Sequence, residues 1–398
     1  MVDRRGAVIK FPPMYPGALF IDRHELKAVE RVIKSKSLFR YYGPKHPKEV
    51  ESFEREFARY LGVRHVLGTS SGTGALYVAM AGLGISHGDE VIVPAYTWIS
   101  TAAAVLAHGA KPILAEVDET LTIDPDDFEA KITPRTKAVV PVHMRGFPCD
   151  MDRIAKVANA NGIKVLEDCA QACGGSFRGR KLGAFGDAAI FSFQLNKVIT
   201  AGEGGAVVTS DTSTYTRCMM AHDTAAIMGI GRKPLQTDEV VLGLNFRMSE
   251  LHAAVLREQL RKLDAIVYRM RRNKMLILKG IKDIPNLELA KSNDSEGDVG
   301  ICLVILMDSV EKANVAERVL TKRGIGVWRL YKKGVPDGHV YTYWRGIAER
   351  FGYDEKTCPR ALGILGRTIH LDVNPLLTKR HVRYMISAIR EAMREAYS

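Results

Sequence analysis

The chain has 398 residues, of which 46% are hydrophobic and 26% are charged, and it carries a net charge of +12. This composition is typical of a globular protein long enough for two domains or for one large domain with an appendage, and no apolar run approaches the ~20 residues that span a bilayer. Because the first residues also lack the apolar core and cleavage site of a signal peptide, we expect a cytoplasmic protein that does not act at a membrane.

In the first part of the chain, predicted strands alternate with predicted helices. Strands that alternate with helices of ten or more residues indicate a mainly parallel sheet with helices on both faces. Such a sheet binds its ligand beyond the carboxyl ends of its strands. The predicted helices cover 22–35, 51–62, 71–84, 97–109, 124–132 and 151–162, and the predicted strands cover 65–70, 89–96, 111–118, 137–144, 164–170, 187–193 and 205–210.

Beyond about residue 250 the pattern changes. A long basic helix is followed by an apolar strand at 301–307, a helix at 311–324 and a final helix at 379–397. These elements indicate a smaller α+β domain. We therefore divide the chain into a large α/β domain, residues 1–250 with the N-terminal segment, and a small C-terminal domain, residues 251–398.

Much of the positive charge lies in residues 257–282, which contain nine Lys or Arg against Glu258 and Asp264. The stretch is typical of the solvated face of a long helix. It could also attract an anionic substrate such as a sugar phosphate, a nucleotide or a carboxylate. No helix-turn-helix, zinc-finger or RNP-like motif accompanies the charge, so we do not expect nucleic-acid binding.

The cysteines are scattered and form no CxxC pair. Cys169 and Cys173 are four residues apart, but no second pair completes a zinc site. We therefore expect buried free thiols in a reducing compartment and no metal centre. The six positions are Cys149, Cys169, Cys173, Cys218, Cys302 and Cys358.

A run of small and hydroxyl residues, TSSGTG, opens a helix directly after a strand. Free N–H groups and the positive end of the helix dipole favour a phosphate at such a position. Ser71 and Thr73 are also favoured as plain N-caps, and that alternative stays open. The spacing matches neither GxxxxGK[ST] nor a GxGxxG turn at the first strand, so neither usual nucleotide cradle is expected.

Two further residues stand at strand ends. Asp168 closes the apolar run KVLED, where a carboxylate needs a cationic partner unless it only caps the next turn. Lys197 lies between the strand at 187–193 and a glycine-rich turn at 202–205. It could be a solvated lysine, or a desolvated amine that acts as nucleophile and base. An anion-binding helix start, an aromatic residue, a strand-end aspartate and this lysine, in that order, are the parts of a pyridoxal phosphate site.

These segments resemble the DegT/DnrJ/StrS-type sugar aminotransferases, which are pyridoxal 5′-phosphate enzymes of the aspartate aminotransferase fold (fold type I). The resemblance covers about residues 20–390 and is strongest through 65–260. It implies a homodimer with shared active sites, with the cofactor in the large domain. It rests on the stretches SSGTGAL, DEVIVPAYTWISTAAAV, GAKPILAEVD, VHMRG, LEDCAQACGG, GAFGDAAIFSFQLNKVITAGEGGAVVT and GLNFRMSELHAAV.

The family assigns roles to matching positions. Lys197 would hold the cofactor as a Schiff base and move the proton, and Asp168 would pair with the pyridinium nitrogen. His143 would be a structural or supporting group near the cofactor rather than a base. The remaining cofactor contacts would be Ser71, Gly72, Thr73 and Ser192 at the phosphate, Trp98 on a ring face, Gln171 at the phenolic oxygen and Asn245 at the phosphate of the neighbouring subunit.

The resemblance implies amino transfer from glutamate or glutamine to a ketone. Gln194 stands where many nucleotide-sugar members have His, and FSFQ is more similar to members that act on keto-cyclitols or make aminohydroxybenzoate. Other stretches resemble an enzyme that makes an 8-amino octulosonate. For the acceptor pocket we name Arg329, Tyr331 and Lys332, from a segment without a motif.

Two other classes of protein remain open. One is a cofactor-dependent dehydratase. Family dehydratases that remove a sugar hydroxyl carry His where Lys197 stands, whereas an aromatising dehydratase keeps the lysine. The other is a basic binding module or a regulator without turnover.

Overall fold

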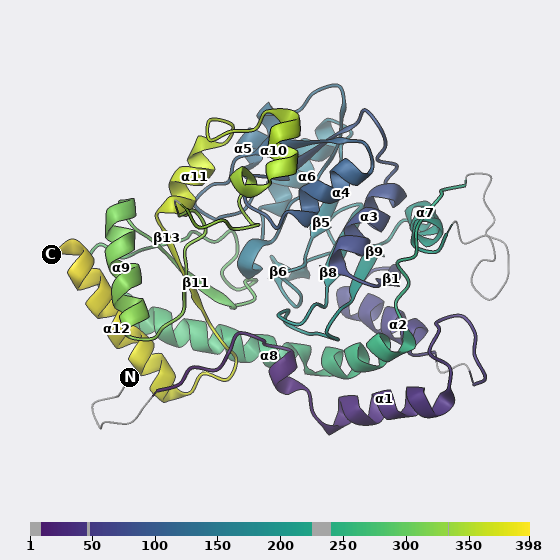
Figure 1. Cartoon of the computed structure of the whole chain (residues 1–398), viewed down its shortest axis with the longest axis horizontal. Coiled ribbons are helices and arrows are strands. Elements are labelled where there is room, and N and C mark those ends of the chain that lie inside the picture. The colour runs from purple at the N-terminus through teal and green to yellow at the C-terminus, as the bar shows by residue number, and fades with distance from the viewer. Residues whose placement is uncertain (1–8, 46–47, 225–239, 333) are drawn as a thin grey trace.

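The computed structural model describes residues 9–45, 48–224, 240–332 and 334–398. Its elements form a large group around a seven-stranded sheet and a smaller group around a four-stranded sheet, joined by one long helix (Figure 1). No helix in the described ranges is long and apolar enough to cross a bilayer.

The large sheet has the order β1-β9-β8-β5-β4-β2-β3. The pairs from β8 through β5, β4 and β2 to β3 are parallel, and β9 pairs antiparallel with both β1 and β8. The predicted mainly parallel sheet is confirmed. Its strands are β1 (His65–Thr69), β2 (Glu90–Pro94), β3 (Lys111–Ala115), β4 (Thr136–Val139), β5 (Lys164–Asp168), β8 (Ala188–Ser192) and β9 (Gly205–Thr209).

The helices of this group start and end at residues that favour those positions. The Oγ of Ser71 caps α3 by accepting from the N–H of Gly74 (3.0 Å), and Gly62 ends α2 with a left-handed φ of 74°. A hairpin of β6 (Ser176–Phe177) and β7 (Arg180–Lys181) follows β5. The helices are α1 (Arg23–Ser35), α2 (Glu49–Leu61), α3 (Gly72–Gly82), α4 (Ser100–Ala107), α5 (Pro125–Ala130), α6 (Met151–Ala160) and α7 (Thr212–His222).

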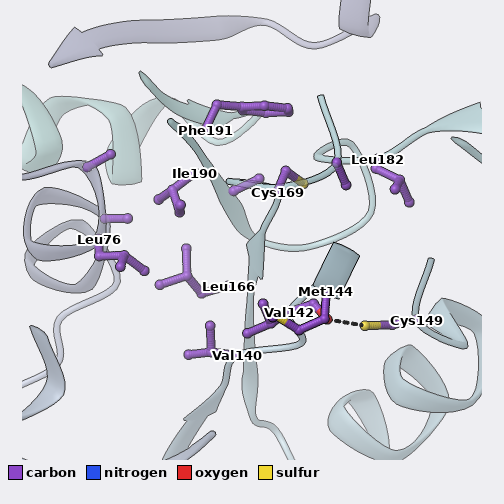
Figure 2. Close-up of a cluster of buried hydrophobic side chains, with 14 of the residues drawn as sticks. Leu76, Val140, Val142, Met144, Cys149, Leu166, Cys169, Leu182, Ile190 and Phe191 are labelled. Carbon is purple, nitrogen blue, oxygen red and sulfur yellow. Dashed lines mark hydrogen bonds between the residues drawn. The ribbon is translucent and has the colours of Figure 1, made fainter. Parts of the chain in front are cut away.

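The sheet is buried on both faces, which explains why its strands read as continuous apolar runs. Every residue of β8 is buried, and Phe191 packs edge-on against Phe57 of α2 with ring centroids 5.0 Å apart. Figure 2 shows this core, with Leu166 and Ile190 among its labelled side chains and the thiol of Cys149 beside the strands. All six cysteines are buried and free, as predicted. This packing fixes the strand ends that carry the site.

The smaller group contains an antiparallel sheet of order β10-β11-β13-β12. The predicted strand at 301–307 and the helices at 311–324 and 379–397 are present. Strands β10, β12 and β13 and the short helices α10 and α11 were not predicted. The elements are β10 (Glu288–Leu289), β11 (Cys302–Leu306), β12 (Val327–Trp328), β13 (Thr368–Asp372), α9 (Val310–Lys322), α10 (Arg345–Phe351), α11 (Pro359–Gly366) and α12 (Lys379–Tyr397).

Helix α8 (Glu250–Ile281) contacts α1 and α2 at one end and α12 at the other (Figure 1). Several of its basic side chains pair with acids: Arg257 with Glu56, and Lys262 with Glu25. Much of the positive stretch at 257–282 therefore stabilises helix packing. The N-terminal Ile9 belongs to the core of the smaller group, and the division at residue 250 stays a prediction.

Candidate active site

A cavity of about 520 Å³ lies at the carboxyl ends of the strands and is closed on its other side by residues of the smaller group. The predicted edge of the sheet is thus the place where the candidate residues meet. Of the predicted cofactor contacts, Asn245 does not line this cavity. The predicted residues that line it are Ser71, Gly72, Thr73, Trp98, Asp168, Gln171, Ser192 and Lys197.

Asp168 is the last residue of β5 and is only 4% exposed. Its carboxylate accepts hydrogen bonds from the hydroxyl of Thr101 (3.0 Å) and from the N–H of Ala170 (3.0 Å). Burial raises the pKa of Asp168, and the positive charge of Lys197 opposes that rise. A buried carboxylate with these partners still gains from a cation placed in the cavity.

Lys197 lies in the turn after β8. Its backbone N–H donates to the carbonyl of Gln194 (2.9 Å), and its backbone carbonyl accepts from the N–H of Gly17 (3.2 Å). These two hydrogen bonds fix the backbone of Lys197 beside the cavity. Burial lowers the pKa of the Lys197 amine, the charge of Asp168 raises it, and the charge of Arg145 lowers it further. A larger fraction of this amine is therefore neutral near pH 7 than for a solvated lysine.

The start of α3 and the end of β8 form a cradle of hydroxyl groups. A Cβ on Gly72 would lie 2.7 Å from the Cβ of Ser192, so the backbone approaches β8 as closely as glycine allows. The hydroxyl of Thr73 donates to Ser100 (3.0 Å), while that of Ser71 caps the helix. Both the capping role and the anion-binding role are compatible with this geometry.

Trp98 and Gln171 also line the cavity. Trp98 is 49% exposed and tilts against the ring of His339 (4.9 Å between centroids). A Cβ on Gly338 would lie 2.7 Å from the indole, so that segment fits closely over Trp98. The Oε1 of Gln171 accepts from the N–H of Arg145 (3.1 Å).

Asn245 is exposed, and its Oδ1 accepts from the N–H of Arg247 (3.3 Å). It pairs with Asp223 in a short antiparallel bridge, outside the cavity lining. Its predicted role requires a second copy of the chain and stays a prediction.

His143 supports the strand ends from below. Its Nε2 lies 3.2 Å from the Oε2 of Glu167, and its Nδ1 accepts from the N–H of Cys149 (3.0 Å). Glu167 also accepts three backbone hydrogen bonds of 2.6–2.8 Å from residues 183–186. These contacts tie His143 and Glu167 to the neighbouring loops. Cys169 lies beside them, and possible ligand atoms of the three buried residues are within 4.8 Å of one another. The structural role of His143 stays a prediction.

The three residues predicted for the acceptor pocket lie elsewhere. Arg329 donates to the carbonyl of Gly366 (2.6 Å), Lys332 pairs with Glu317 (3.1 Å), and Tyr331 donates to Glu355 (2.9 Å). The segment has no regular period, so its sequence did not show which side chains face inward. Trp328, Leu330 and His339 line the cavity instead.

Sequence reasoning also missed Thr101, Arg145 and Asp372, which line the cavity. The charge in VHMRG, directly after a predicted strand, was a usable signal for Arg145. Asp372 comes from a strand more than two hundred residues further along, and its pairing with Arg145 (2.5 Å) is visible only in the fold.

A family model described as the DegT/DnrJ/EryC1/StrS aminotransferase family matches residues 20–390. The chain is 33% identical over 386 residues to the spore coat polysaccharide biosynthesis protein SpsC of Bacillus subtilis, across 94% of this chain and 96% of SpsC. It is 42% identical over 269 residues to an L-glutamine:2-deoxy-scyllo-inosose aminotransferase of Streptoalloteichus tenebrarius, across 64% of this chain and 62% of that relative, which is less than two thirds of its length.

Among solved structures, 3-amino-5-hydroxybenzoic acid synthase superposes with a TM-score of 0.80 at 30% identity, across 97% of this chain and 99% of that one. The cavity residues fit the family's cofactor: a helix start with hydroxyls suits a phosphate, a buried carboxylate suits a pyridinium, and an amine of lowered pKa suits a covalent link. The chain therefore belongs to the DegT/DnrJ/EryC1/StrS aminotransferase family and is a pyridoxal phosphate-dependent aminotransferase.

Proposed function

We propose that the protein transfers an amino group from glutamate or glutamine to a keto group of a sugar, a sugar acid such as an 8-oxo octulosonate, or a keto-cyclitol. The reaction would serve the synthesis of amino sugars, antibiotics or surface polysaccharides. The observation that carries the proposal is the meeting of Lys197 and Asp168 in one cavity, beside a helix start that suits a phosphate. The names of SpsC and of the inosose aminotransferase support this substrate range.

When bound, pyridoxal phosphate supplies an electron sink that makes the C–H bond at the amino-bearing carbon labile. Asp168, whose carboxylate accepts from the hydroxyl of Thr101, would pair with the positive ring nitrogen. The Nζ of Lys197 would take the proton from the substrate carbon and deliver it to the cofactor carbon that has received the amino group, and it would move a proton in the opposite direction in the other half-reaction. A lowered pKa leaves the amine free to accept that proton. The α3 start and Ser192 would hold the phosphate of the cofactor and so keep the cofactor in the same cavity as Lys197.

We also propose that the working unit is a homodimer in which Asn245 reaches the phosphate of the neighbouring site. Its neighbours Leu242 and Leu244 are 83% and 55% exposed, an arrangement that a second copy would cover. Mixing a Lys197→Ala protein with an Asn245→Ala protein should restore part of the activity if one intact site forms in the mixed dimer. Equal inactivity of the mixture, with dimers demonstrably exchanged, would contradict a shared site.

The direct test of the proposed reaction supplies the holoprotein with glutamate or glutamine and a panel of ketones. The panel contains a nucleotide-linked keto sugar, an oxo sugar acid and a keto-cyclitol. We expect the 2-oxo acid of the donor to form beyond one equivalent per site only when one class of ketone is present, and this further 2-oxo acid should equal the aminated product. If neither amino acid converts the bound cofactor to its amino form, the proposal is wrong.

A second candidate is an aromatising dehydratase of the aminohydroxybenzoate synthase type. The similarity to the solved synthase over nearly the whole chain favours it, as does Gln194, which lines the cavity. This activity would convert a suitable amino-ketone into an ultraviolet-absorbing aromatic product with no amino donor. Strict dependence on a donor would reject it.

A further inference from the structure

Arg145 occupies an unusual backbone position beside the site. It lies in the turn Met144–Gly146 with φ 53° and ψ 26°, a left-handed conformation that non-glycine residues adopt rarely and at a cost. Its backbone N–H donates a hydrogen bond to the Oε1 of Gln171. This conformation places the guanidinium at the cavity, facing the smaller group.

The guanidinium is only partly used by its neighbours. Its Nη2 contacts the Oδ1 of Asp372 (2.5 Å) and the thiol of Cys302 (3.2 Å). Its Nε is buried and has no hydrogen-bond partner among the described residues. A guanidinium has five N–H donors, and leaving buried donors unpaired is unfavourable. Arg145 therefore keeps donor capacity that the protein itself does not fill.

Asp372, at the end of β13, neutralises this charge. Its Oδ1 accepts from Arg145 and its Oδ2 accepts from the indole N–H of Trp328 (3.1 Å). The side chains of Arg145 and Asp372 are 20% and 21% exposed. The pair thus borders the open cavity and links the large group to the end of β13, instead of lying in the closed core.

The position of the pair is suited to substrate, because Arg145 and Asp372 line the same cavity as Lys197. The proposed reaction brings two different molecules to one cavity in turn, and at least the amino donor carries a carboxylate. A carboxylate can accept two N–H groups of one guanidinium at the same time, whereas Asp372 accepts only from Nη2.

We propose that Arg145 binds a substrate carboxylate and that Asp372 is the internal anion which this carboxylate displaces. The inference rests on the proposed aminotransfer, because it needs a carboxylate-bearing substrate next to Lys197. When no carboxylate is bound, Asp372 closes onto Arg145 and leaves the cavity neutral for a substrate without that group. The carboxylate can come from the amino donor or from an acidic keto acceptor.

The donor arm of the test uses the holoprotein and 2-methyl-L-glutamate, which has no hydrogen at C2 and cannot turn over. Its α-amide, 2-methyl-L-isoglutamine, lacks the α-carboxylate but keeps the side-chain carboxylate, so the pair of probes tests the α-carboxylate. Both dissociation constants are measured from the change in cofactor absorbance. If the donor supplies the carboxylate, the wild-type protein should prefer the acid by about tenfold to a hundredfold.

The acceptor arm uses the protein loaded with pyridoxamine 5′-phosphate. Calorimetry compares D-glucuronate with D-glucose, which differ in the carboxylate. A preference for the acid in this arm, and not in the donor arm, assigns the carboxylate to the acceptor.

Variants of Arg145 and Asp372 show whether this ion pair binds substrate or only stabilises the structure. Arg145→Gln should abolish the preference for the acid probe, and Arg145→Lys should keep part of it. Asp372→Asn should strengthen binding of the acid a few-fold, since it removes the competing anion, whereas a structural clamp would weaken both probes in both variants. Arg323→Gln breaks a comparable ion pair with Glu391 far from the cavity and should change nothing.

Three results would overturn the inference: no acid preference in either wild-type arm, a preference that survives in Arg145→Gln, or a loss in Asp372→Asn as large as in Arg145→Gln. The proposed reaction is judged separately, by 2-oxo acid formation in the wild-type protein. Turnover together with a preserved preference in Arg145→Gln would reject this inference alone.

Discussion

The two sides of the cavity are built differently. The wall at which we propose that the cofactor binds, called the cofactor wall, consists of residues at or just after strand ends of the large sheet. The substrate wall combines one turn of the large group with distant parts of the smaller one. We define the cofactor wall as Ser71, Gly72, Thr73, Asp168, Ser192 and Lys197, and the substrate wall as Arg145, Trp328, His339 and Asp372.

One difference is the hydrogen bonding of the charged residues Asp168 and Arg145. On the cofactor wall, Asp168 has two hydrogen bonds to neighbouring residues. At the substrate wall, the Nε of Arg145 and the nearby hydroxyl of Tyr96 are buried without a partner in the part of the chain that the structure describes. Unpaired buried donors are uncommon. We infer that the cofactor wall is preformed and that the substrate wall is completed by its ligand.

The largest effect should come from the cofactor wall at Lys197. Lys197→Ala removes both the covalent link and the proton carrier, so we expect kcat with glutamate and the best ketone to fall by about 10⁴-fold or more. Lys332→Ala, which loses only a pair with Glu317, is the matched control and should keep normal activity. Comparable rates in the two variants would remove Lys197 from the chemistry.

Asp168→Ala should retain the fold and lose turnover by about 10²- to 10³-fold, because the positive ring nitrogen loses its anion. Circular dichroism checks the fold and single-turnover kinetics with glutamate measures the loss. Asp126→Ala, at an exposed ion pair, serves as the control. Wild-type turnover in Asp168→Ala would mean that the electron sink is placed wrongly.

A smaller effect is expected at the phosphate cradle. Gly72→Ala forces a Cβ against Ser192, so cofactor affinity should fall by about tenfold. Gly363→Ala, which meets no atom within 4 Å, should bind the cofactor normally. Equilibrium titration of the apoprotein with pyridoxal phosphate measures both. Unchanged affinity in Gly72→Ala would argue against a phosphate at this helix start.

The smallest expected effect is a change in the pKa of Lys197, on the cofactor wall, when Arg145, on the substrate wall, is replaced. In the cofactor-free protein the pKa of Lys197 should lie below the ordinary value of 10.5, because burial and Arg145 disfavour its charge. Arg145→Gln removes a positive neighbour, so the Lys197 pKa should rise. Competitive acetylation across a pH series, read by peptide mass spectrometry with Lys332 as internal reference, measures both values. A lower Lys197 pKa in Arg145→Gln would contradict the proximity of the walls.

The sequence predicted the large sheet, most helices and the residues of the cofactor wall. These residues could be predicted because Ser71, Asp168 and Ser192 each stand at the carboxyl end of an apolar run. Parallel strands bring their carboxyl ends together at one edge of the sheet. The substrate wall was not predicted. Arg145, Trp328 and Asp372 are far apart in the chain, and short strands without clear alternation bring them together. Arg329 and Lys332 were chosen for charge, yet both pair with groups of their own domain.

Borohydride reduction of the holoprotein, followed by peptide mapping, tests the central claim most directly. We predict a yellow protein in which reduction fixes one equivalent of cofactor to the peptide that contains Lys197. Cofactor fixed to another lysine, or a colourless protein that ignores added pyridoxal phosphate, would contradict the account.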